Sequence, residues 1–176
     1  LDLDAAYAAA GDGDTAPVDT VAAAERIAQD PNGTIRWLEV TLAGQDVVGA
    51  LLGVAERVVQ EHPQAAVACI DRALALPATS DSSQRTSQRI RAVELMEQVD
   101  PYRAAELWRQ LPQYLQNKRM PSVSSEDEAR IAAGLSGHDV DAALAYVSTA
   151  KWQFEAARYK AAIIRRIAPT QPERAF

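Results

Sequence analysis

Two histidines and a single cysteine are the residues in this sequence that most often serve as catalytic bases, nucleophiles or metal ligands. His62 and His138 each lie at an expected helix boundary, where histidines are commonly exposed to solvent. A Ser-His-Asp arrangement could be proposed among the many serines and acids, but no serine has the flanking residues of a nucleophile elbow, so we do not expect a catalytic histidine. Cys69 alone permits no internal disulfide and no cysteine-based zinc site. Its neighbours Ala68 and Ile70 predict a buried, inert thiol.

Acidic residues gather in two places where a catalytic or metal-binding role has to be considered. The run 125–128 has the form of a capping box, with Ser125 as the helix N-cap and Glu128 three residues later; a metal site is the alternative. Glu94 and Glu97 share one face of an expected helix, whereas a glycosidase holds its carboxylates across a cleft. No glycine-rich phosphate loop follows an expected strand. We therefore expect a protein that is not an enzyme and that uses no cofactor and no metal.

Basic residues are concentrated near the carboxyl end of the chain, and they form the best candidate for a binding site. The candidates for partner binding are Arg158, Lys160, Arg165, Arg166 and the neighbouring Trp152. The four cations suit the negative end of a helix dipole, and they could also hold an anionic partner. A plain solvated face is the alternative interpretation. A tryptophan becomes an interface candidate if its ring is exposed.

Size, composition and charge indicate an ordered helical protein. The chain has 176 residues, of which 48% are apolar and 24% charged, as in ordinary globular domains. We expect an acidic, flexible segment over 1–17, one all-helical domain over 18–168 and a frayed tail over 169–176. Residues 1–60 carry ten acidic and three basic residues, which argues against a nucleic-acid partner. No run of eighteen apolar residues supports membrane insertion.

The first residue is leucine, so we expect a processed or trimmed chain. A bacterial periplasmic or secreted location after signal removal and a cytoplasmic location both stay open.

Capping and breaking residues divide the chain into helices joined by turns. The expected helices cover residues 1–10, 20–29, 34–41, 46–61, 63–76, 84–98, 101–111, 125–135, 140–149 and 153–167. A strand is the alternative for 34–41, which is rich in β-branched residues. We expect turns at 30–33 and 136–139, and we expect Pro112 to interrupt or end its helix.

Small residues at a helical spacing mark two expected packing faces. They are Ala66, Ile70 and Ala73 in one helix, and Ala157, Ala161 and Ile164 in another. The segment 156–169, with Ala157, Ile164 and Pro169, resembles the second helix of a tetratricopeptide repeat. The segment 129–139 is similar, more loosely, to the helical superhelix that precedes the catalytic domain of soluble lytic transglycosylases. These resemblances imply stacked helix pairs, and they carry no catalytic residue onto this chain.

The expected fold is all-α, with antiparallel helix pairs stacked as a short superhelical array like that of tetratricopeptide repeats. The expected function is a non-enzymatic protein–protein interaction module, an adaptor or scaffold that belongs to a larger assembly and binds another protein. One alternative is a helical accessory domain of a larger envelope enzyme such as a lytic transglycosylase. Another is a helical domain with a small-ligand pocket lined by Trp37, Trp108 or Trp152. The oligomeric state stays open.

Overall fold

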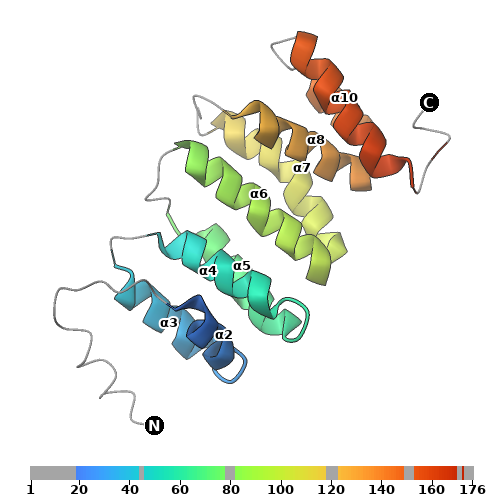
Figure 1. Cartoon of the computed structure of the whole chain (residues 1–176). Coiled ribbons are helices and arrows are strands. Elements are labelled where there is room, and N and C mark those ends of the chain that lie inside the picture. Colours follow the sequence, from blue (N-terminus) through green and yellow to red (C-terminus); the bar gives the residue numbers. More distant parts are fainter. Residues whose placement is uncertain are drawn as a thin grey trace. The chain divides into compact units, whose positions relative to one another are not determined.

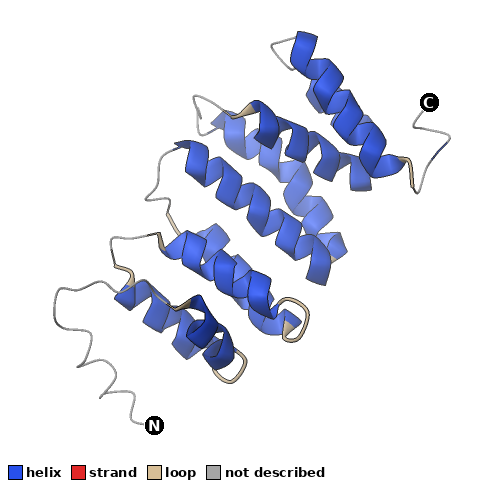
Figure 2. Cartoon of the chain, in the orientation of Figure 1, coloured by secondary structure: helices blue, strands red, loops and turns tan. Residues whose placement is uncertain are grey.

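A computed structural model describes residues 19–43, 46–77, 82–117, 123–148, 153–169 and 172. The long elements in these ranges are nine helices (Figures 1 and 2), so the all-α prediction is confirmed for the described part of the chain. The alternative of a strand over 34–41 is wrong, because these residues are helical. The helix expected over 1–10 and the acidic segment expected over 1–17 lie outside the described residues.

The chain consists of two compact units, Leu1–Thr79 and Ser80–Phe176. That residues 18–168 form a single domain stays a prediction. The first unit contains four described helices: α2 (Thr20–Ile27), α3 (Pro31–Thr41), α4 (Val47–Val58) and α5 (Pro63–Ala75). Helix α4 packs against α5 and α2, while α3 contacts α2, α4 and α5.

Aspartate caps begin three of the four helices in the first unit. Asp19, Asp30 and Asp46 each accept a hydrogen bond from a backbone amide in the first turn, with N···O distances of 2.8–2.9 Å. The turn predicted over 30–33 is therefore wrong. Asp30 is instead the N-cap of α3 and Pro31 occupies its first turn, where a missing amide hydrogen costs nothing.

The core of the first unit contains the small-residue face predicted on α5. Ala66, Ile70 and Ala73 are all buried there, which confirms this packing face. Cys69 lies on the same side and is fully buried. Burial raises the pKa of the Cys69 thiol from 9.0 to about 12, because a thiolate loses its hydration inside an apolar core.

Cys69 is expected to resist alkylation as long as the first unit is folded. A thiol with this pKa has a thiolate fraction at pH 8 that is about a thousandfold below that of an ordinary cysteine. Iodoacetamide labelling followed by mass spectrometry should show slow modification in buffer and rapid modification in 6 M urea. Rapid labelling in buffer, with unchanged circular dichroism, would contradict the buried position.

The second unit contains five described helices: α6 (Ser82–Val99), α7 (Pro101–Asn117), α8 (Ser125–His138), α9 (Val140–Ser148) and α10 (Gln153–Ile167). Helix α8 is central, because it contacts each of the other four. Helix α10 packs mainly against α8 and α9 and lies at one edge of this unit (Figure 1).

Three predicted boundaries in the second unit are wrong, and tertiary packing accounts for the first. Pro112 lies inside α7 without ending it, because Trp108, Leu111 and Leu115 are buried on one face on both sides of the proline. Helix α8 continues to His138 and takes in most of the turn expected at 136–139.

The third correction concerns the start of α8. Its N-cap is Ser124 and not Ser125, since the Ser124 hydroxyl accepts a hydrogen bond from the Asp127 amide at 3.1 Å.

In the described part of the chain, no helix has the length and apolar character needed to cross a bilayer.

Candidate functional site

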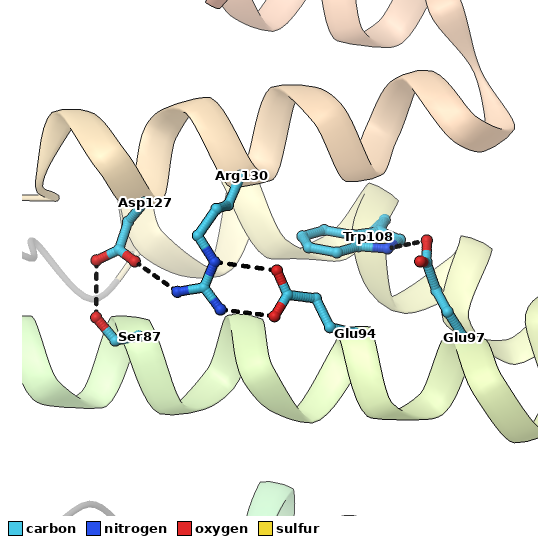
Figure 3. Close-up of polar contacts among 6 residues, drawn as sticks. All are labelled: Ser87, Glu94, Glu97, Trp108, Asp127 and Arg130. Atoms are coloured by element: carbon cyan, nitrogen blue, oxygen red, sulfur yellow. Dashed lines mark hydrogen bonds and ion pairs between the residues drawn. The ribbon is translucent and has the colours of Figure 1, made fainter. Parts of the chain in front are cut away.

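An ionic cluster joins α6 to α8 (Figure 3). We call it the α6–α8 cluster, and its members are Ser87, Glu94, Asp127 and Arg130. Arg130 donates two hydrogen bonds to the Glu94 carboxylate, from Nε at 3.0 Å and from a terminal nitrogen at 2.6 Å. Its other terminal nitrogen donates to Asp127 at 3.2 Å. The hydrogen bond to Glu94 is the main cause that raises the pKa of Arg130 above its ordinary value.

The charged groups of the α6–α8 cluster are paired with one another, so the cluster has a structural role. The Asp127 side chain is only 6% exposed, and its second carboxylate oxygen accepts a hydrogen bond from the Ser87 hydroxyl at 2.9 Å. Each charged group in the cluster thus has a partner of opposite charge. Such a network fixes how two helices pack.

Glu97 gathers donors from three other helices. The Trp108 indole nitrogen, at 2.8 Å, and His138 Nε2, at 3.1 Å, both contact its Oε1. Arg166 donates to Oε2 at 2.8 Å. His138 therefore contacts a carboxylate rather than a serine, and it is partly buried where we expected an exposed cap. This carboxylate connects α6 to α7, α8 and α10.

Gly134 makes room for the tryptophan that reaches Glu97. Trp108 is 1% exposed and lies against Gly134 of α8. A Cβ at this glycine would come within 2.6 Å of ring atom Cδ2, and closer still to Cε2 and Cζ2. The prediction that a tryptophan serves as a core anchor is confirmed for Trp108. Trp37 is half-buried, with the Arg26 guanidinium carbon 4.9 Å from its ring centre.

Helix α10 is fastened to the unit through one face. Tyr159, Ile163 and Ile167 are buried along that face, and the Tyr159 hydroxyl donates to Glu128 of α8. Arg166 adds the link to Glu97. These large side chains, spaced four apart, bury more apolar surface than the alanines do, so they set the orientation of the helix.

The small-residue face predicted on α10 points away from the core. Ala157 is exposed, Ala161 is half-buried and Ile164 is 44% exposed. The expectation that this stripe packs against a neighbouring helix is therefore wrong for the described part of the chain. The tetratricopeptide resemblance depended on this stripe.

The predicted basic site contains three cations that could bind a partner and one that is already paired within the chain. Arg158, Lys160 and Arg165 are exposed and have no ion-pair partner among the described residues. Arg166 is half-exposed and is committed to Glu97. Trp152 lies outside the described residues.

We call six residues on the side of this helix opposite its buried face the α10 outer face; they are Ala157, Arg158, Lys160, Ala161, Ile164 and Arg165. Arg158 and Arg165, seven residues apart, follow one side of the helix. Lys160 and Ile164, four apart, follow the other side, and the two alanines lie between them. The result is a narrow apolar strip with cations along its borders.

Sequence reasoning missed the contacts of Arg130 and Glu97. Asp127 and Arg130 have the i, i+3 spacing of a helical ion pair, so this pair could have been predicted from the sequence. Glu94 is 36 residues from Arg130, and no local pattern connects them. Among the side chains that the structure describes, no three His, Cys, Asp or Glu residues converge as a metal site would require.

No protein-family model, curated protein or solved structure matches the chain.

Proposed function

We propose that the chain is a non-enzymatic protein-interaction module of the helical-repeat type, and that the α10 outer face binds an acidic helix of a partner protein. The observation that supports this is that one helix combines an exposed apolar strip with cations that have no ion-pair partner among the described residues. Cations alone would suit a solvated face. Ile164 and the alanines add the apolar centre that protein interfaces place inside a polar rim.

The residue types on the α10 outer face favour a helix as the partner. Alanine side chains let a second helix approach closely, while the bulkier Ile164 can fill a gap between the partner's side chains. Arg158 and Arg165 on one side and Lys160 on the other favour carboxylates at both edges of that partner. One helix face buries little area, so we expect a transient complex with a Kd of about 10–100 µM.

The helical-repeat part of the proposal is supported by packing between consecutive helices. Within the first unit α4 packs on α5, and within the second unit α6 packs on α7 and α8 on α9. Repeat arrays are built from such neighbouring helix pairs.

Charge reversal on the α10 outer face is expected to weaken the binding of an acidic helical peptide about tenfold. The probe is a synthetic peptide of about 18 residues with a leucine strip bordered by glutamates, measured by fluorescence anisotropy at low salt. The variant is Arg158→Glu with Arg165→Glu, which removes two exposed ion pairs worth about 0.5–1 kcal/mol each.

The matched control carries the same change of net charge on another helix. Arg103→Glu with Arg109→Glu places two reversals on exposed positions of α7, and it should leave the Kd within about twofold of the wild-type value. Equal losses in both variants would mean unspecific charge attraction and would contradict the proposal. Binding to anionic phospholipid vesicles without binding to the peptide would contradict it as well.

A further inference from the structure

A second outward helix face carries the opposite charge in the first unit. Helix α2 buries Ala23 and Ile27 and turns Val21 and Glu25 to solvent, with its exposed N-cap Asp19 beside them. Val21 is 48% exposed, and Glu25 has no ion-pair partner among the described residues. We call Asp19, Val21, Ala22 and Glu25 the α2 outer face.

The α2 and α10 outer faces both contain an exposed apolar side chain, and they carry charges of opposite sign. Each presents one exposed β-branched side chain, Val21 on α2 and Ile164 on α10, next to one alanine on α2 and two alanines on α10. Glu25 and the N-cap Asp19 make the first face negative, whereas cations border the apolar strip of the second face. Opposite charges around two apolar strips are the arrangement that favours mutual recognition.

The charge of the whole chain is divided in the same sense. Residues 1–79 carry twelve acidic and four basic residues, a net charge of −8, while residues 80–176 net +2. Two copies of the chain therefore attract each other when the first unit of one approaches α10 of the other.

We propose that the partner of the α10 outer face is a second copy of this chain, whose α2 outer face docks there. This inference rests on the proposed function and names its partner. Glu25 and Asp19 face Arg158, Lys160 and Arg165 across the contact, and Val21 lies against Ile164. The two surfaces differ, so the contact is heterologous, and copies either close into a ring or extend into a chain. Helix α2 has only eight residues, so the contact is small and the chain is monomeric when dilute.

Sedimentation equilibrium of the full chain over about 10–500 µM tests the proposal. Wild type should associate at low salt, and the association constant should fall at least about tenfold between 20 mM and 300 mM NaCl. Two variants should each lower it by at least about tenfold. One is Val21→Ser with Glu25→Lys on α2; the other is Arg158→Glu with Arg165→Glu on α10. The α7 control, Arg103→Glu with Arg109→Glu, should associate like wild type.

Mixing the α2 and α10 variants gives the sharpest result. Each keeps one intact surface, so an equimolar mixture should form a pair and nothing larger, at concentrations at which each variant alone is mainly monomeric. Wild type that is monomeric at every concentration, or a mixture that does not pair, would overturn the self-association.

If the wild type does not self-associate, the peptide-binding experiment shows whether the proposed function fails as well. If the acidic peptide still binds and the α10 reversal still weakens its binding about tenfold, then the α10 outer face recognises a different protein. If the peptide does not bind either, both the inference and the proposed function are wrong.

Discussion

Replacing Gly134 by alanine is expected to lower the free energy of unfolding of the second unit by about 2–3 kcal/mol. The new methyl group would overlap the indole ring of Trp108, and both sides of that contact are rigid. One side is helical backbone, and the other is a buried ring whose nitrogen donates to Glu97 at 2.8 Å. Either the ring or α8 must move. Urea denaturation followed by circular dichroism measures the loss.

The same substitution at Gly53 serves as the control and should have the opposite sign. A Cβ there would meet only Thr20 Cγ2 at 3.8 Å, an ordinary van der Waals distance. Alanine inside a helix is favoured over glycine by about 0.5–1 kcal/mol, so Gly53→Ala should stabilise the first unit. A Gly134→Ala variant as stable as wild type would show that Trp108 does not lie against α8 as described.

Replacing Arg130 by methionine is expected to cost about 2–4 kcal/mol of stability in the second unit. Methionine keeps most of the apolar stem of the side chain, but it leaves Glu94 without its two hydrogen bonds and Asp127 without its cation. Asp127 carries most of this penalty, because its side chain is 6% exposed and water cannot replace the arginine. Urea denaturation is again the measurement.

Two further variants separate this effect from the loss of an arginine as such. Arg109→Met breaks an exposed pair with Glu106, whose charged atoms are 3.5 Å apart, and should change stability by less than about 0.5 kcal/mol. Adding Asp127→Asn to Arg130→Met should recover part of the loss, since the buried charge is then gone. Equal effects of Arg130→Met and Arg109→Met would show that the α6–α8 cluster does not hold the two helices together.

Local signals predicted most of the helices because caps and prolines act through neighbouring residues. Asp46 begins α4 and Pro63 begins α5 as expected, and the predicted bounds 153–167 of α10 agree with the structure. Pro112 was misjudged, because burial on both sides of the proline holds α7 together and is a tertiary effect.

The inward face of α10 was the other main error, and it has the same kind of cause. The alanines and Ile164 have a helical period, but so do Tyr159, Ile163 and Ile167. The partners on α8 decide which set is buried, and they lie far away in the sequence. The cations of the candidate site were visible in the sequence, whereas the commitment of Arg166 to Glu97, 69 residues away, was not.

Amide NMR spectroscopy of the full chain during titration with the acidic peptide tests most directly whether the α10 outer face binds a partner. The proposed function predicts chemical-shift changes centred on Ala157, Ala161 and Ile164, and their loss in the Arg158→Glu, Arg165→Glu variant. Shifts centred elsewhere, for example around the 93% exposed Tyr102 of α7, or no shifts at millimolar peptide, would contradict it.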